Sequence, residues 1–85
     1  MKTITVRYFA SIREALGTGN ERVSTAAPDV HALRDQLIAR GGTYGEALAR
    51  GRAVRLSLDQ TMVADESAPL ADGAEVAFFP PVTGG

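Results

Sequence analysis

The first ten residues alternate between two kinds of side chain, as the residues of a half-buried β-strand do. The side chains expected on the core face are apolar and belong to Ile4, Val6 and Tyr8. Those expected on the opposite face belong to Thr5, Arg7 and Phe9. Because successive side chains of a strand point to opposite faces, this segment predicts a strand with one buried surface.

A short helix and a second strand are predicted next. In "SIREALG", Ser11 and Glu14 have the spacing of a capping box, and Gly17 suits the left-handed conformation that ends many helices. After a turn at "GTGN", residues 21–25 place Val23 between polar neighbours. This segment is expected to pair with the first strand as a hairpin.

The main helix is predicted within "PDVHALRDQLIARGG", residues 28–42. Asp29 is its expected N-cap, and Gly41 is expected to stop it. Its apolar stripe recurs at helical spacing and consists of Val30, Leu33 and Leu37. His31 lies early in the helix, where we expect a solvated or capping role, because one histidine cannot supply a multi-histidine metal site.

The second half of the chain predicts mostly short strands. We expect a weak helical turn at residues 43–50, followed by a strand at 54–59 and a short partner strand at 61–64. A loop at residues 65–73 then leads to the final strand at 74–79. Asp59 and Gln60 are expected to reverse the chain between the first two of these strands.

This order of elements predicts an α+β fold, in which one main helix packs across a mixed sheet. If the final strand lies beside the first, their connection is a crossover through the helix, which favours a central parallel pair. That is the β-grasp arrangement of ubiquitin-like proteins. We expect residues 1–79 to form this domain and residues 80–85 to form an extended C-terminal tail.

Composition restricts the chemistry that this chain can perform. The 85 residues are 45% hydrophobic and 22% charged, which predicts one globular domain with a modest core. No segment resembles a signal peptide or a membrane span, so we expect a soluble, cytoplasmic protein without a membrane partner. Cysteine is absent, which excludes disulfides, thiolate metal sites and thiol nucleophiles, and no metal site is expected.

Charge argues against nucleic acid as a partner, because the formal net charge is −1. All nine Lys and Arg lie at or before Arg55, whereas five acidic residues follow it. Segments interleave in a folded domain, so a mixed surface is preferred over an acidic docking face.

Two aromatic residues are expected to point away from the core. In the final strand, Val76 and Phe78 share one face, and Phe79 lies on the other. The same alternation sends Phe9 outward from the first strand. If these strands are neighbours, both rings share a solvent-facing patch that could bind a partner. The alternative is that a bulge returns one ring to the core.

The last six residues predict a stiff extension. Pro80 and Pro81 cannot donate hydrogen bonds to a sheet and fix φ near −65°, so they end the strand in an extended conformation. At about 3.1 Å per residue, residues 81–85 would reach roughly 15 Å. Val82 could anchor this segment, while Gly84 and Gly85 suit a narrow channel that excludes any Cβ. The alternative is a frayed terminus.

The whole pattern resembles a known family. "YFASIREALG", "ALRDQL", "DQTMV" and above all "LADGAEVAFFPPVTGG" are similar to the small, sulfur-carrying subunits of molybdopterin synthase, which are ubiquitin-like proteins. The resemblance covers nearly the whole chain and is most specific at its end. Asp59 departs from it, since relatives often have Asn there, and this puts only local loop chemistry in doubt.

The resemblance implies a carrier that is not an enzyme on its own. An E1-like enzyme would use ATP to adenylate the carboxylate of Gly85, and sulfur from a sulfurtransferase would replace AMP to give a thiocarboxylate. The chain itself would bind no cofactor. The large synthase subunit, in a heterotetramer, would accept the tail and pass the sulfur to cyclic pyranopterin monophosphate. Gly84 would give steric relief, and Pro80, Pro81, Val82 and Thr83 would guide the tail.

Two other functions remain open. A related carrier for thiazole synthesis would share the fold and the Gly-Gly end. A protein modifier or interaction module would instead form isopeptide bonds or dock through its Pro-Pro segment. Pairing with a large synthase subunit would favour the first interpretation, and conjugates to lysine in cells would favour the modifier.

Overall fold

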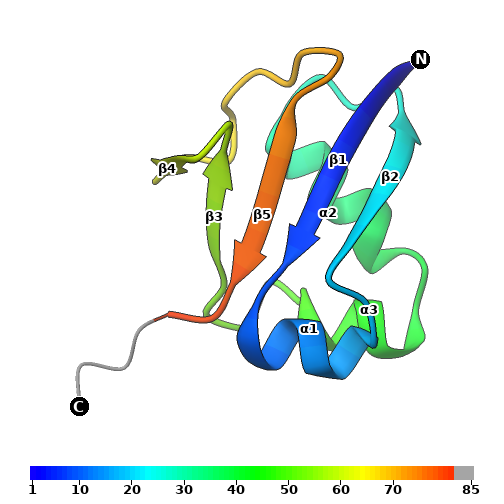
Figure 1. Cartoon of the computed structure of the whole chain (residues 1–85), viewed down its shortest axis with the longest axis vertical. Helices are drawn as coiled ribbons and strands as arrows, with labels where there is room; N and C mark the ends of the chain where they lie inside the picture. The colour runs from blue at the N-terminus through cyan, green and yellow to red at the C-terminus, as the bar shows by residue number, and fades with distance from the viewer. Residues whose placement is uncertain (82–85) are drawn as a thin grey trace.

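Five strands form one mixed sheet in the order β2-β1-β5-β3-β4. A computed structural model describes residues 1–81 (Figure 1). Along the chain the elements are β1 (Lys2–Tyr8), α1 (Ala10–Leu16), β2 (Asn20–Thr25), α2 (Val30–Ile38), α3 (Gly42–Ala47), β3 (Arg55–Leu58), β4 (Thr61–Val63) and β5 (Glu75–Phe79). None of the helices in this described range is long and apolar enough to cross a membrane.

The central pair of the sheet is parallel, as the sequence predicted. β1 and β5 pair in parallel, with Tyr8 opposite Phe78, and β5 pairs antiparallel with β3 on its other side. β2 pairs antiparallel with β1, so that predicted pairing is confirmed, with α1 in the connection. α2 crosses one face of this sheet (Figure 1). The α+β, β-grasp prediction is therefore confirmed.

The hydrophobic core lies between the sheet and α2. The predicted core face of β1 and the predicted stripe of α2 are fully buried: Ile4, Val6, Tyr8, Val30, Leu33 and Leu37. Phe78 of β5 is also fully buried, and its ring stacks on Tyr8 with centroids 6.1 Å apart. Burying a side chain of this size stabilises the fold by about 1.5–3 kcal/mol.

The start of α2 agrees with the sequence, and its end differs slightly. Asp29 is the N-cap, and its carboxylate accepts a hydrogen bond from the backbone N–H of Ala32 at 2.8 Å. The helix ends at Ile38, before the stop expected at Gly41. Gly41 instead adopts a positive φ of 76° and leads into α3, which confirms the helical turn predicted within residues 43–50.

The capping box predicted for α1 is wrong. The helix begins at Ala10, so Ser11 lies inside its first turn, and Phe9 at the N-cap position makes no side-chain capping bond. The cause is the neighbouring strand: the N–H of Phe9 bonds the carbonyl of Phe78 at 3.1 Å, which holds Phe9 in an extended conformation until the helix starts. Gly17 ends the helix with φ 73°, as predicted.

The reversal at Asp59 and Gln60 is confirmed. Both residues have positive φ, 49° and 69°, in a two-residue turn between β3 and β4. The Asp59 carboxylate accepts a hydrogen bond from the backbone N–H of Glu75 at 2.9 Å, so this turn is attached to β5. An Asp at this position therefore suits the turn, despite the departure from the family pattern.

Candidate functional site

The predicted tail begins on the central strand of the sheet. β5 pairs with β1 up to Phe78 and with β3 up to Phe79, which lies opposite Arg55. Pro80 and Pro81 follow outside the strand, as their missing N–H groups require. Val82, Thr83, Gly84 and Gly85 lie outside the described residues, so the roles predicted for them, and the boundary between domain and tail, stay predictions.

Phe9 and Phe79 form one aromatic patch on the outer face of the sheet, opposite the core. Their ring centroids are 6.3 Å apart, and the ring planes meet at 83° in an edge-to-face contact. Phe9 is 40% exposed and Phe79 is half-buried, so neither ring has been returned to the core by a bulge. The predicted geometry is confirmed, whereas the partner-binding role of the two residues stays a prediction.

The structure adds Met62 to this patch. Met62 is 52% exposed on β4 and lies opposite Ser57 of β3, which in turn lies opposite Ala77 of β5. A shallow groove of about 540 Å³ runs across these strands and includes Phe9, Met62, Ala77 and Phe79 in its lining. The alternation of residues 61–63 could have indicated that Met62 lies on a different face from Thr61 and Val63. Only the pairing of β3 with both β4 and β5 places Met62 in the same groove as Phe79.

Ala77 lines the groove but is only 5% exposed. Strand alternation puts it on the same outer face as Phe79, where it lies between Arg7 and Ser57, its neighbours on β1 and β3. The flanking side chains cover it because β5 is central in the sheet. A small residue at this position leaves the groove open between the two larger apolar side chains, Met62 and Phe79.

Charged side chains border the apolar patch. The Arg7 guanidinium lies 5.5 Å from the centre of the Phe9 ring, a cation–π contact, and 3.9 Å from the Glu75 carboxylate. Both partners of that ion pair remain partly exposed, so it adds little to stability. An apolar centre with a charged rim is typical of a surface that binds another protein.

A second, smaller hollow adjoins the root of the tail. Its volume is about 250 Å³, and its lining includes Ile12 and Ala15 of α1, Val54 before β3, Arg52 and Pro80. Pro80 forms part of the wall of this hollow together with residues of α1 and of the segment before β3. The first residue of the tail therefore borders a small open space on the surface of the domain.

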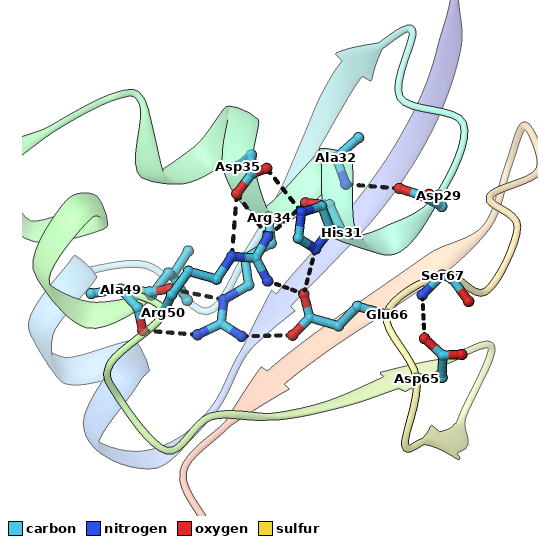
Figure 2. Close-up of polar contacts among 11 residues, drawn as sticks. Asp29, His31, Ala32, Arg34, Asp35, Ala49, Arg50, Asp65, Glu66 and Ser67 are labelled. Atoms are coloured by element: carbon cyan, nitrogen blue, oxygen red, sulfur yellow. Dashed lines mark hydrogen bonds and ion pairs between the residues drawn. The ribbon is translucent and has the colours of Figure 1, made fainter.

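His31 belongs to a polar cluster away from the tail, which Figure 2 shows. Its imidazole lies 3.3 Å from Asp35 and 3.7 Å from Glu66, and it is exposed, which agrees with the solvated role predicted for it. Within residues 1–81 no group of three or more His, Cys, Asp or Glu side chains could hold a metal ion. Arg34 and Arg50 instead supply the positive charge of this cluster.

Arg34 is the buried centre of the same cluster (Figure 2). It is 4% exposed and donates hydrogen bonds to the carbonyls of Leu48 and Ala49, at 2.8 and 2.9 Å, and to Glu66 at 2.7 Å. Burial opposes ionisation of Glu66, but hydrogen bonds from Arg50 and Arg34 outweigh it and lower the pKa of this carboxyl. Through these hydrogen bonds Arg34 connects α2 to the residues that follow α3 and to the loop before β5.

Glu21 is the centre of a second polar cluster at the other edge of the sheet. Its carboxylate accepts hydrogen bonds from the hydroxyls of Tyr8 and Tyr44, at 2.9 and 2.8 Å, and from Arg40 at 2.9 Å. Burial opposes ionisation, but the hydrogen bonds from Tyr44, Arg40 and Tyr8 prevail, and the pKa of Glu21 is lowered. Burial and the same carboxylate raise the pKa of Tyr8. Both clusters hold the fold together.

Comparison with known proteins agrees with the fold and with the resemblance noted in the sequence. The model of the ThiS family matches residues 6–85. The molybdopterin synthase sulfur carrier subunit of Escherichia coli K12 is 44% identical over 96% of this chain and 99% of its own length. The protein of the same name from Mycobacterium tuberculosis is 37% identical over the full length of both chains.

Solved structures show the same fold. Subunit 1 in a protein–protein complex with subunit 2 of the molybdopterin-converting factor from Helicobacter pylori superposes with a TM-score of 0.70. Its sequence is 26% identical, and the match covers 98% of this chain and 99% of that one. The small archaeal modifier protein 1 of Haloferax volcanii gives a TM-score of 0.76 at 22% identity, over 96% and 100% of the two chains, and this likeness concerns the fold alone.

Proposed function

The chain belongs to the ThiS family, and from this membership we propose that it is the sulfur carrier subunit of a molybdopterin synthase. The observation that carries the proposal is the 44% identity, over nearly the full length of both chains, to the E. coli protein of that name. The fold supports the proposal, because the tail begins on the best-supported strand of the sheet and beside an exposed aromatic patch.

In this function Gly85 carries the sulfur. A carboxylate is a poor acyl donor until a good leaving group is attached, so an E1-like enzyme joins it to AMP at the expense of ATP. Sulfur at the oxidation level of hydrosulfide then attacks the carbonyl carbon, the bond from that carbon to the phosphate oxygen breaks, AMP leaves, and a thiocarboxylate remains. The large subunit receives this tail, and the sulfur passes to cyclic pyranopterin monophosphate. The carrier is therefore a sulfur-donating subunit and is not an enzyme by itself.

The aromatic patch is the proposed contact surface for the large subunit. The H. pylori relative occurs in a complex of subunits 1 and 2, which supports a partner of this kind. Phe9, Met62 and Phe79 would bury apolar area against it, while Pro80 and Pro81 direct the tail into its active site. We propose a heterotetramer of two carriers on a dimer of large subunits, with a sulfurtransferase as the sulfur source.

Intact-mass measurement tests the proposal. The protein is incubated with a cognate E1-like enzyme, ATP and a sulfur source, and its mass is expected to rise by the difference between one sulfur and one oxygen atom. A chain that ends at Thr83 is the matched control and should keep its mass. An unchanged mass for the full chain, when an established carrier is converted in parallel, contradicts the proposal.

The Gly-Gly end of the sequence leaves a second candidate function open, attachment of the chain to other proteins. The family also leaves open a carrier for thiazole synthesis. Isolation of the proteins that bind or are joined to this chain separates the three functions. A large synthase subunit would support the first proposal, and a thiazole-forming enzyme would support the carrier for thiazole synthesis. Isopeptide conjugates on lysine residues of other proteins would support the modifier.

A further inference from the structure

The chain carries few groups that could attack an activated acyl end. It has no cysteine and a single lysine, Lys2, against eight arginines. An acyl adenylate or thioester reacts readily with thiols and amines. A guanidinium stays protonated at every physiological pH and presents no lone pair for attack. The internal amines that could form a stable amide with the carbonyl carbon of Gly85 are therefore those of Lys2 and Met1.

The amine of Lys2 is occupied by the fold. Lys2 is the first residue of β1 and lies opposite Thr25 of β2. Its Nζ donates a hydrogen bond to the backbone carbonyl of Ala27 at 2.8 Å, and the residue is half-buried. Attack on an acyl group would require this hydrogen bond to break.

Both amines also lie at the end of the sheet opposite the root of the tail. β1 and β5 are parallel, and Tyr8 pairs with Phe78, so Phe79 is level with residue 9 (Figure 1). At about 3.3 Å per residue, Lys2 is roughly 23 Å from that level, and Met1 is farther. Six residues, 80–85, span about 20 Å when fully extended, which falls short of Met1. Even with the length of the Lys2 side chain added, Gly85 approaches that amine only if the whole tail doubles back along the sheet in full extension.

The cationic side chains near the root of the tail are arginines. Arg55 pairs with Phe79 across β3 and β5, Arg52 lines the hollow that includes Pro80, and Arg7 lies over the Phe9 ring. A lysine at any of these positions would carry the same charge with an attackable amine. Its amine would also lie near Phe79 or Pro80 in space, where the tail begins.

We propose that the surface around the tail is built to be inert toward the chain's own activated end. In the avoided side reaction, the lysine nitrogen bonds to the carbonyl carbon of Gly85, AMP or a thiol leaves, and the amine proton passes to solvent. The product is an internal amide that can no longer carry sulfur. The inference rests on the proposed function, because only an activated Gly85 needs this protection.

A synthetic acyl donor tests the inference directly. The full chain is prepared with an aryl thioester at Gly85 and held at mildly alkaline pH in dilute solution, without any enzyme. The variants are Arg55→Lys and Arg52→Lys. The control is Ala71→Lys, which adds one exposed amine in the loop before β5, at the far end of the sheet. Circular dichroism establishes that each variant is folded.

The wild-type chain and Ala71→Lys are expected to hydrolyse to the free acid. Arg55→Lys and Arg52→Lys should accumulate a species one water lighter, which digestion maps to the new lysine. For a short tether the effective concentration is of the order of mM, so at protein concentrations near 10 μM the internal reaction should exceed the intermolecular one about 100-fold. Its rate should be independent of protein concentration.

Two results would overturn the inference: an internal amide in the wild-type chain, or hydrolysis alone in both arginine-to-lysine variants. The thioester is made chemically, so this experiment needs neither the activating enzyme nor the synthase. A negative result here is therefore separate from a failure to form the thiocarboxylate, which would count against the proposed function itself.

Discussion

Phe79 performs two tasks that its position in the sheet makes compatible. Its backbone pairs with Arg55 as the last residue of β5, while its ring lies on the outer face against Phe9. Pro80 follows at once and ends the pairing. Phe79 is thus both the last paired residue of β5 and a member of the aromatic patch. The tail begins at the next residue, so its first residue is held one peptide unit from the patch.

The substitution Phe79→Asp is expected to weaken binding of the large subunit at least 30-fold, or about 2 kcal/mol, because a charge would replace a central apolar contact. Isothermal titration calorimetry measures the loss. The matched control is Thr61→Asp, which adds the same charge at an exposed position of β4 one residue from Met62. Equal affinity of Phe79→Asp and the control would remove the patch from the interface.

The face of the sheet on which a side chain lies was predictable from sequence where the alternation along one strand is enough to decide it. Alternation placed Ile4 in the core and Phe9 on the outer face without any knowledge of strand order. The sequence did not indicate that Met62 belongs to the patch, because its place in the same groove as Phe79 depends on β3 pairing with both β4 and β5. Pairing between distant segments leaves no local pattern, so the full extent of the patch appeared only in the structure.

At the scale of elements, long-range bonds decide where helices begin and which segments are joined. Ser11 and Glu14 have capping spacing, but the bond from Phe9 to Phe78 sets the start of α1 two residues earlier than a Ser11 cap would. Asp29 caps α2 as its local sequence predicts, because the tertiary bonds beside it join the backbone of residues 28 and 30 to the loop before β5 and leave its carboxylate to accept from Ala32. Arg34 is not part of the apolar stripe of α2, yet it is the buried link among three segments.

The substitution Arg34→Met is expected to lower the free energy of unfolding by about 3 kcal/mol. It would leave the carbonyls of Leu48 and Ala49 without their donor and remove one cation from Glu66. Urea denaturation at neutral pH measures the change. Arg22→Met on β2, an exposed position, is the control and should change stability by less than about 0.5 kcal/mol. A similar small change at Arg34 would show that the link contributes little.

At the scale of the whole molecule, the uneven charge of the chain becomes a mixed surface, as preferred from the sequence. Acidic residues of the last third pair with basic residues from earlier segments: Glu66 with Arg34 and Arg50, and Glu75 with Arg7. The carboxylates that matter most for stability are the partly buried Glu66 and Glu21, one in each polar cluster.

Acid is expected to destabilise the fold through these two carboxyls. Both pKa values are lower in the folded chain than the ordinary glutamate value of 4.5, so folding favours the ionised form. Their contribution is complete above that value and is lost as the pH falls through the folded pKa values. Urea midpoints between pH 7 and pH 3 should therefore fall most steeply below about pH 4.5.

The variant Glu21→Gln should have a shallower acid limb than the wild-type chain and a lower midpoint at neutral pH, since an uncharged amide binds Arg40 more weakly. Glu14→Gln in α1, an exposed position, should reproduce the wild-type profile. An unchanged acid limb in Glu21→Gln would contradict the assignment of pH sensitivity to this carboxyl.

The insertion of β5 between β1 and β3 also bears on protein synthesis. The strand that joins the two halves of the sheet is the last one to leave the ribosome, since it occupies residues 75–79. A nascent or prematurely terminated chain that lacks it leaves β1 and β3 with unpaired edges, which chaperones and proteases recognise. A fragment that stops before residue 75 therefore lacks the strand that joins the two halves of the sheet, and we expect it to be degraded instead of accumulating as a folded protein.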